Sequence, residues 1–229
     1  MPNESDLRMK VSDALNSRKS VRAFTDAPVD PAVIRRVLAT ASRAPSGGNV
    51  QPWHVDVVGG AELEALKAEV REAIAKGAQT PEYAIYPDGL SEPYKSRRFG
   101  IGEAMYAALG VPREDKAGRM KWFMRNFAFF DAPVALFTTV ARTMGPPQWS
   151  DLGMFLQSVM LMLREEGLDS CAQECWAIYP ETIRGFLGTP TERMLFCGMA
   201  IGHADTRAPV NTLHSARAPL EEFAHFRGI

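Results

Sequence analysis

The sequence has few cysteines: only Cys171, Cys175 and Cys197 occur among its 229 residues. An odd number without Cys-x-x-Cys spacing excludes a disulfide framework and the usual zinc signatures, and it fits a reducing compartment. The cytoplasm is therefore the expected location. Cys171 and Cys175 lie four positions apart and could bind a metal only if other ligands joined them; otherwise they line the core or a pocket. The histidines are scattered without metal spacing, so no metal site is expected.

Long apolar runs and an excess of one charge are also absent. No stretch approaches the roughly 18 apolar residues of a membrane-spanning helix, and the polar start MPNESDLRMKVSDAL lacks the apolar core of a signal peptide. Lysine and arginine number 26 against 27 aspartate and glutamate, a formal net charge of -1. That balance gives no general electrostatic attraction to nucleic acid or to an anionic membrane surface. Neither is expected as a partner.

The sequence also lacks obvious repeats, and no Gly-x-Gly-x-x-Gly run follows a predicted strand. A Rossmann dinucleotide site is therefore not expected. What is present is an ordinary globular composition, with 46% apolar and 23% charged residues. The length suits one domain with a sizeable core, and residues 1–229 are expected to form it.

Hydrophobic periodicity predicts an α+β sandwich of helices on a mixed sheet. The expected helices cover residues 6–17, a segment from Asp30 to before Pro45, residues 61–76 and residues 151–167. Asp30 is a suitable N-cap before Pro31, and Gly77 and Gly167 are natural stops. The expected strands cover residues 53–59, 133–141 and 193–202.

Two segments depart from this pattern. Residues 78–130 contain many aromatic and basic residues, and we expect a largely helical insertion that lies over a pocket. Most of its aromatics should belong to the core, with a few available to stack on a flat substrate. Residues 205–229, the tail, are polar and contain prolines at 209 and 219. A segment of this kind is too irregular for a core of its own and usually wraps another structure.

The stretch SRKSVRAF, residues 17–24, places Arg18, Lys19 and Arg22 around Ser20, just past the first helix. Taken alone, it is typical of a solvated basic helix end that interacts favourably with the helix dipole. The alternative is an anion site, because arginine forks bind phosphate in two-pronged fashion and a serine hydroxyl adds a short hydrogen bond. Arg217 in the tail presents the same choice between solvent and ligand.

The stretch PSGGNVQPW, residues 45–53, is longer than a plain turn needs and closes on an aromatic residue. Its glycines let backbone approach a flat ligand, and an asparagine can donate and accept at a polar edge. It is either a rigid turn before a strand or a loop that lines a ligand, and Trp53 is expected to begin the strand as a core residue.

Three ordered motifs in this chain together resemble the FMN-dependent nitroreductase family. They are Arg-Lys-Ser-x-Arg from residue 18, Pro-Ser-x-x-Asn-x-Gln-Pro-Trp from residue 45, and Asn-Thr-x-x-x-x-Arg-x-Pro-Leu from residue 211. The resemblance covers nearly the whole chain. The stretches YPDGLSEPYKSRRFGIGEAMY and FMRNFAFFDAPV resemble the bacterial branch of nitrobenzoate and nitroaromatic reductases. The fold implied is the nitroreductase-like sandwich, a central and mostly antiparallel sheet flanked by helices.

The resemblance implies that FMN is bound by the first motif and the tail. Arg18 and Ser20 would contact its phosphate, Lys19 would lie beside the ribityl chain and phosphate, and Arg22 would reach the pyrimidine edge of the ring. A cation at that edge stabilises the negative charge that gathers on reduction. Arg217 would close on the phosphate. Many relatives carry a lysine two positions before this arginine, where this chain has Ser215.

The remaining contacts would come from two further segments. The resemblance implies a homodimer in which Pro45, Ser46, Gly47 and Asn49 line the flavin of the other subunit and the tail embraces the partner. After the buried helix, relatives place a short loop whose backbone amide faces flavin N5. Ala172, Gln173 and Glu174 hold that place here.

The implied activity is transfer of hydride from NADH or NADPH through FMN to a nitroaromatic or similar flat acceptor, with ping-pong kinetics at one shared site. No side chain has to be catalytic, because the flavin carries the chemistry. The alternatives on the same scaffold are a reductive dehalogenase, another ene or quinone reductase, and a flavin-binding module without turnover. Arg97, Arg98 and Arg125 are either solvated or available to attract an acidic substrate.

Overall fold

A four-stranded sheet forms the centre of the computed structural model, which describes residues 9–229. The strands are β1 (His54–Gly59), β2 (Val134–Ala141), β3 (Asp169–Gln173) and β4 (Arg193–Gly202), in the order β1-β2-β4-β3. All three pairings between neighbours are antiparallel. The expected α+β sandwich with a mostly antiparallel sheet is confirmed.

The two central strands separate two apolar cores. Along β2, Ala135 and Phe137 join one core while Leu136 joins the other, because successive side chains of a strand point to opposite faces. On β4, Ala200 and Met199 divide in the same way. Both strands are almost wholly buried, which explains why they read as continuous apolar runs in the sequence.

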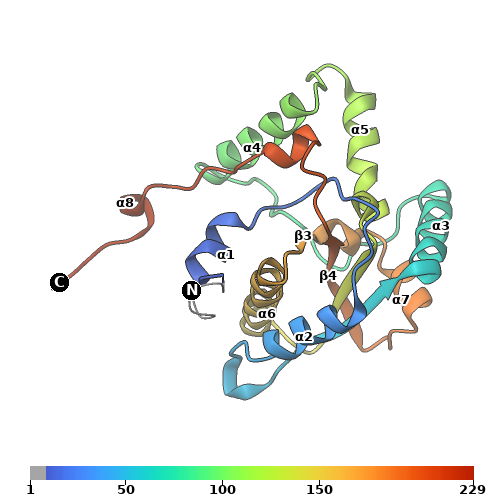
Figure 1. The fold of residues 1–229 in the computed structure, drawn as a ribbon, viewed down its shortest axis with the longest axis horizontal. Helices are drawn as coiled ribbons and strands as arrows, with labels where there is room; N and C mark the ends of the chain where they lie inside the picture. The colour runs from blue at the N-terminus through green and yellow to red at the C-terminus, as the bar shows by residue number, and fades with distance from the viewer. Residues whose placement is uncertain (1–8) are drawn as a thin grey trace, which may run out of the picture.

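Helices cover both faces of the sheet (Figure 1). One core contains residues of α3 (Gly60–Lys76) and α7 (Pro180–Leu187), and the other contains residues of α2 (Pro31–Ala41) and α6 (Pro146–Glu165). A short α1 (Val11–Ser17) contacts α6. Trp53 packs on the second core with its ring stacked on Phe155, at a centroid distance of 4.9 Å. Its core position is as expected, but β1 begins one residue later than predicted, at His54.

The helix boundaries follow the predicted caps. The Asp30 carboxylate accepts a hydrogen bond of 2.8 Å from the Ala32 amide, and Gly77 follows the end of α3 with a φ of 122°. Gly167 lies just past α6 with a φ of 73°. Helix α6 begins at Pro146, earlier than predicted, because prolines suit the first turn of a helix. The prediction for residues 6–8 lies outside the described residues.

The segment after α6 was expected to be a loop, and this prediction is wrong. Asp169–Gln173 forms the edge strand β3, and the 3-10 turn η4 (Glu174–Ile178) follows it. The short strand mixes polar and small residues, so its sequence lacks a clear alternating pattern. Its pairing with β4, from Asp169 opposite Gly202 to Gln173 opposite Gly198, defines it.

The insertion contains α4 (Tyr94–Ala108), α5 (Lys116–Met124) and the 3-10 segment η3 (Arg125–Asp131). Arg119 of α5 forms two hydrogen bonds with the Glu103 carboxylate of α4, of 2.5 and 3.0 Å, and its guanidinium lies 4.3 Å from the Tyr106 ring centroid. Neither helix has a fully buried residue. None of the helices within residues 9–229 combines the length and apolarity needed to cross a bilayer.

The tail leaves the body of the molecule (Figure 1). It contains the 3-10 turn η5 (Pro209–Thr212) and the single-turn helix α8 (Leu220–Phe223). Val210 and Asn211 are buried, whereas Phe223, Phe226 and Ile229 are 69%, 64% and 98% exposed. A pair between Arg97 and Glu222 links α8 to α4. The tail therefore has an anchored beginning and an uncovered apolar end.

Candidate functional site

The basic segment that follows α1 runs beside the edge strand β3. Ser20 and Ser170 form an isolated parallel bridge, and the Val21 amide donates a hydrogen bond of 3.0 Å to the Ser170 carbonyl. Burial raises the pKa of Cys171, while Arg22, Ser20 and Arg18 act in the opposite direction. These three residues therefore lie near the Cys171 thiol at the edge of the sheet. Residues 18–22 and 172–174, distant in sequence, share this edge.

Within residues 9–229, the cations of this segment have no acidic partner. Arg18, Lys19 and Arg22 are each partly buried, and none forms an ion pair with a carboxylate of the described residues. Lys19 donates to the Asn211 carbonyl, and Arg22 donates weakly to the Ser20 carbonyl at 3.4 Å. Three partly buried cations without a counter-ion, beside a serine hydroxyl, fit a dianionic group such as a phosphate ester.

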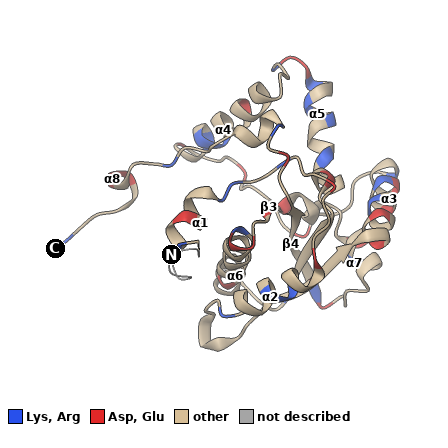
Figure 2. Cartoon of the chain, in the orientation of Figure 1, with Lys and Arg blue, Asp and Glu red and all other residues tan. Residues whose placement is uncertain are grey.

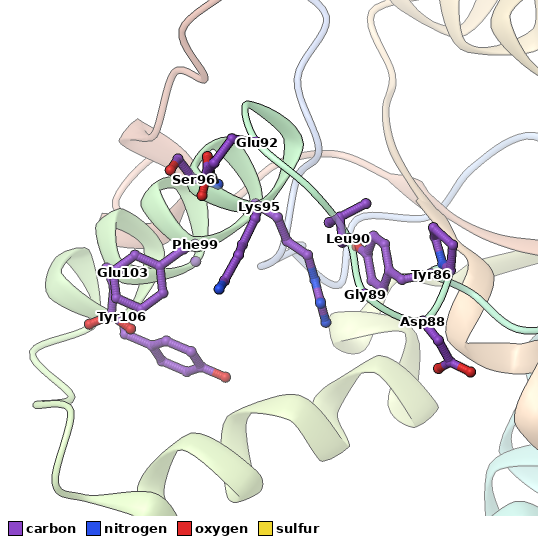
Figure 3. Close-up of a pocket in the computed structure, with 13 residues that line it drawn as sticks. Tyr86, Asp88, Gly89, Leu90, Glu92, Lys95, Ser96, Phe99, Glu103 and Tyr106 are labelled. Carbon is purple, nitrogen blue, oxygen red and sulfur yellow. Dashed lines mark hydrogen bonds between the residues drawn. The ribbon is translucent and has the colours of Figure 1, made fainter.

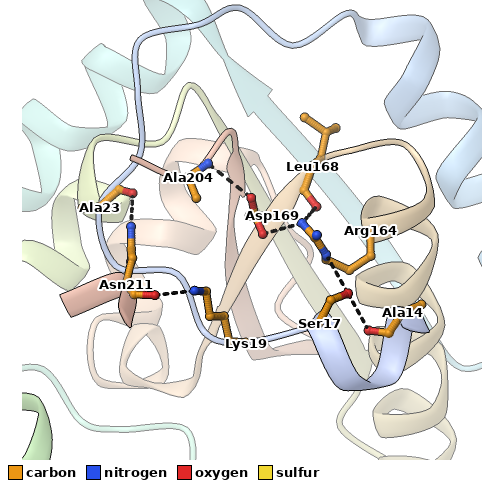
Figure 4. A network of polar contacts seen from close by, with 9 residues as sticks. All are labelled: Ala14, Ser17, Lys19, Ala23, Arg164, Leu168, Asp169, Ala204 and Asn211. Carbon is orange, nitrogen blue, oxygen red and sulfur yellow. Dashed lines mark hydrogen bonds and ion pairs between the residues drawn. The ribbon is translucent and has the colours of Figure 1, made fainter. Parts of the chain in front are cut away.

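A polar network fixes the base of this segment (Figure 4). Arg164 of α6 donates to the Asp169 carboxylate at 2.6 Å, to the Leu168 carbonyl at 3.2 Å and to the Ser17 hydroxyl at 3.3 Å. The other Asp169 oxygen accepts from the Ala204 amide at 3.3 Å. One ion pair thereby connects the end of α1, the start of β3 and the chain beyond β4.

The second predicted contact segment divides between cavity and core. Ala172 and Glu174 are exposed and line a cavity of about 400 Å³. The other lining residues belong to α6 and β4: Gly153, Leu156, Met160, Phe196 and Cys197. Gln173 is 3% exposed, and its amide nitrogen donates to the Asn126 carbonyl at 2.8 Å. Because side chains alternate along a strand, the Gln173 side chain is directed away from the cavity. Burial raises the pKa of the Glu174 carboxyl.

The cysteines near this cavity are buried free thiols. Burial raises the pKa of Cys171 and of Cys175, and it raises that of Cys197 to about 12. They are neutral near pH 7 and are not nucleophiles: Cys197 lines the cavity, whereas Cys171 and Cys175 belong to the apolar core. Within residues 9–229, no group of three or more acidic, cysteine or histidine side chains is placed to hold a metal ion.

The loop at residues 45–49 lies elsewhere in the same chain. It contains the 3-10 turn η2 (Gly47–Asn49), in which Gly48 and Asn49 have φ values of 57°. The Gly47 amide contacts both oxygens of Asp151, a buried carboxylate of α6, at 3.3 Å each. In Figure 1 the loop lies beyond α2 at the bottom, whereas residues 18–22 follow α1 toward the other end of the sheet. One chain does not bring these two predicted segments together.

The Arg217 guanidinium makes its contacts within the tail. It donates to the Ser215 hydroxyl at 2.6 Å and to the Ser215 and Ala216 carbonyls at 3.0 Å each. Residues 213–216 border a cavity of about 330 Å³ against α4. Arg217 is exposed, and among the described residues it pairs with no carboxylate. Its charge is available to a ligand or to a second chain.

The insertion borders a larger cavity of about 800 Å³ (Figure 3). Lys95, Phe99 and Tyr106 of α4 line it together with Tyr86. The Arg98 guanidinium lies 3.8 Å from the Tyr86 ring centroid. The other two arginines considered as substrate contacts are paired: Arg97 with Glu222, and Arg125 with Asp131 at 2.5 Å. Only Arg98 of the three therefore faces this cavity without an acidic partner among the described residues.

No role in the site was predicted for the residues that support the basic segment. Arg164 and Asp169 lie five positions apart, across the turn from α6 to β3, and Asn211 begins the tail motif. Asn211 is 4% exposed and bonds the backbone of residues 22 and 23. The sequence contained one signal for this residue, its place at the start of the tail motif. The hydrogen bonds of Asn211 in the structure show its role.

The chain is similar in sequence to known nitroreductases. A family model described as the nitroreductase family matches residues 15–203. The 4-nitrobenzoate reductase of Nocardioides sp. (strain LMS-CY) is 37% identical, covering 93% of this chain and 87% of that protein. The nitrobenzene nitroreductase of Ectopseudomonas oleovorans is 35% identical, covering 94% of this chain and 96% of that protein.

Solved structures agree. The FMN and NADPH-dependent nitroreductase NfnB from Sphigopyxis sp. strain HMH superposes with a TM-score of 0.94 at 53% identity. The superposition covers 96% of this chain and 100% of that chain. The FMN-dependent nitroreductase NfnB from Mycobacterium smegmatis, in complex with NADPH, gives a TM-score of 0.90 at 32% identity, with 94% and 97% covered. By family model, sequence identity and fold, the chain belongs to the nitroreductase family.

Proposed function

We propose that this chain is an NAD(P)H-dependent FMN nitroreductase that acts on nitroaromatic compounds. The relatives that cover nearly all of the chain are named as reductases of nitrobenzoate and nitrobenzene, and two similar structures are described as FMN-dependent. The observation that carries the proposal is the set of cations at residues 18, 19 and 22 beside the edge strand β3, none of which pairs with a carboxylate of residues 9–229. They fit the phosphate and the electron-rich edge of FMN.

The residues divide into holding and tuning roles. Arg18 and Ser20, with Lys19 beside them, hold the phosphate. Arg22 supplies a positive charge for the pyrimidine edge of the ring, where it favours the reduced flavin. Ala172 and Glu174 border the ring because they face the cavity, and the strand β3 contributes backbone there. FMN held by these residues would supply the transfer of hydride from NADH or NADPH to the acceptor at one shared site.

A homodimer completes this site in our proposal. The loop at residues 45–49 is exposed and lies away from residues 18–22 of its own chain, so a second chain supplies it. The tail exposes Phe223, Phe226 and Ile229. An apolar cavity of about 530 Å³ between α2 and the edge strand β1, lined by residues such as Ile34 and Val57, has the matching character.

Figure 2 shows basic residues on the segment after α1 and acidic and basic residues mixed over the helices. The positive charge is therefore local, as expected for a small anionic cofactor and not for a polyanion. The flat acceptor enters beside the insertion, whose exposed aromatics Tyr86 and Phe99 can stack on an aromatic ring. The cytoplasm is the proposed location, supported by three free thiols.

The test is anaerobic mixing of the purified protein with NADH and with NADPH, followed by a panel of nitroarenes, with flavin absorbance recorded. We expect a yellow protein, about one FMN per chain on heat release, bleaching by at least one nicotinamide and recovery of colour with a nitroarene. FAD on release, or a colourless protein that ignores added FMN, contradicts the cofactor. A yellow protein that neither nicotinamide bleaches is a flavin-binding module instead.

A further inference from the structure

Asn211 lies at the point where the tail begins, and its polar groups are engaged with the chain around it. It is 4% exposed within η5. Its side-chain oxygen accepts from the Arg22 amide at 2.8 Å. Its side-chain nitrogen donates to the Ala23 carbonyl at 2.8 Å and to the Asp205 carbonyl at 2.9 Å. Its own carbonyl accepts from the Lys19 ammonium (Figure 4).

The bonds of the Asn211 side chain fix backbone rather than another side chain. Arg22 contributes its amide and Ala23 its carbonyl. These two groups lie on either side of the peptide group that joins the two residues, so one side chain fixes the backbone at both points. Only a short carboxamide offers an acceptor and two donors at this reach. Aspartate would keep the acceptor and lose the donors, and its negative charge would lie next to carbonyl oxygens in a buried position.

The bond from Lys19 has a second consequence. An ammonium that donates to a neutral carbonyl is oriented without being neutralised, so its full charge acts on an approaching anion. Lys19 forms no ion pair with a carboxylate among residues 9–229, which leaves the Asn211 carbonyl as its recorded partner there. Asn211 thereby orients one cation through its backbone and fixes the chain that carries another.

Core packing does not account for this residue. Its neighbour Val210 is 2% exposed and is the buried apolar residue of the turn, whereas the Asn211 side chain is hydrogen-bonded to backbone. A buried polar side chain with three hydrogen bonds to backbone serves geometry, since apolar residues bury surface more favourably.

We propose that Asn211 is the positioning residue of the phosphate site: it orients Lys19 toward the phosphate, fixes the backbone that carries Arg22, and connects that geometry to the tail. The inference rests on the proposed FMN function and adds to it a residue that touches no part of the cofactor. Its consequence is greater for FMN than for riboflavin, because the Lys19 side chain that Asn211 orients would act on the phosphate, whereas Arg22 is held only through its backbone amide. Affinity for a flavin without phosphate depends much less on Asn211.

The experiment compares FMN with riboflavin, which lacks the phosphate. Full-length FMN-loaded protein is diluted and the released flavin is read by fluorescence to give the Kd for FMN; displacement by added riboflavin gives the second Kd. In Asn211→Ala we expect the Kd for FMN to rise about tenfold and that for riboflavin to change little. Asn211→Asp should show the larger loss for FMN, because added negative charge repels phosphate.

The matched control is Thr212→Ala in the same turn, whose hydroxyl donates at 2.8 Å to the Pro209 carbonyl. It should leave both constants unchanged. A double variant with Lys19→Ala should lose less FMN affinity than the sum of the single losses, because the two residues act together. Thermal unfolding is recorded for each variant, and Asn211→Ser is the milder replacement if the alanine variant does not fold.

Three outcomes overturn the proposal: an unchanged Kd for FMN, an equal rise for FMN and riboflavin, or failure of both the alanine and serine variants to fold. The last would make Asn211 a folding residue. Failure of the proposed function is seen separately, because wild-type protein would then bind no flavin or bind FMN and riboflavin equally well.

Discussion

At the scale of single residues, the feature that defines the site is the kind of partner its cations have. The chain carries slightly more acidic than basic residues, yet Lys19 and Arg22 donate to carbonyl groups instead of carboxylates. Other arginines form ion pairs with carboxylates: Arg164 with Asp169 at 2.6 Å and Arg142 with Glu82 at 2.8 Å. Because no carboxylate of residues 9–229 pairs with the cations of residues 18–22, their positive charge is available to a ligand.

Arg18→Ala should weaken FMN binding by roughly 1.5–3 kcal/mol, because it removes a charged hydrogen bond to the phosphate. That corresponds to a rise of about 10- to 150-fold in Kd. The measurement is flavin release on dilution of the full-length protein. Arg71→Ala is the matched control, since Arg71 lies exposed on α3 and should not affect binding. Wild-type affinity in the Arg18 variant would rule out its role at the phosphate.

At the scale of elements, the edge of β3 depends on one large ring beneath it. Trp176 of η4 is fully buried, stacks on Phe129 at 4.4 Å and meets Phe137 edge-on at 5.3 Å. Its indole nitrogen donates at 3.4 Å to the side-chain oxygen of Gln173. The strand can bring Ala172 and Glu174 to the cavity because Gln173, between them, is held in the core.

Gly198 of β4 gives this ring its space. A Cβ at that position would lie 2.2 Å from Cδ1 of Trp176, which is the body of a buried ring and cannot move away. Gly198→Ala should therefore lower the free energy of unfolding by about 1–3 kcal/mol, and it should also displace the edge of β3 and weaken flavin binding. Chemical denaturation with fluorescence detection measures the change.

Gly185→Ala on α7 is the control for this substitution. A Cβ there meets nothing within 4 Å, so stability should stay unchanged or rise by about 0.5–1 kcal/mol. Equal stability of the Gly198 variant and the wild type would show that Trp176 can be repacked and that the close approach is not required.

At the scale of the whole molecule, the tail joins two regions of different character. Its first residues, around Val210 and Asn211, are buried in their own chain. Its last residues extend away from the body and expose aromatic side chains to solvent (Figure 1). Exposed phenylalanines at the end of a long segment are unfavourable in an isolated chain and favourable in an interface. This contrast supports a homodimer with exchanged tails.

Two truncations separate these roles. A chain that ends at Thr212 keeps Asn211 and should fold, yet it should lose the dimer and most of its flavin. A chain that ends at Asp205 also loses Val210 and Asn211, and should unfold at a lower temperature as well. Light scattering with flavin absorbance on the same peak provides the measurement. A protein ending at Thr212 that stays dimeric and yellow would show that the tail is not required for either.

The sequence by itself determined the family and the main elements. Three motifs in order indicated a nitroreductase, and continuous apolar runs gave β2 and β4 because strands buried on both faces need no polar alternation. Asp30 and Gly77 marked helix ends by local chemistry, which requires no knowledge of distant residues. The resemblance identified the residues of the basic segment as a flavin site, because their local composition alone is also typical of a solvated helix end.

Only the tertiary structure decided which of these residues meet. The strand β3 exists because β4 pairs with it, so its short mixed sequence gave no signal. That pairing places Gln173 in the core and its neighbours at the cavity. Asn211 reaches Arg22 across 189 positions of sequence, and the loop at residues 45–49 is placed away from the cations. Such contacts depend on chain topology, which local propensity and hydrophobic period do not encode.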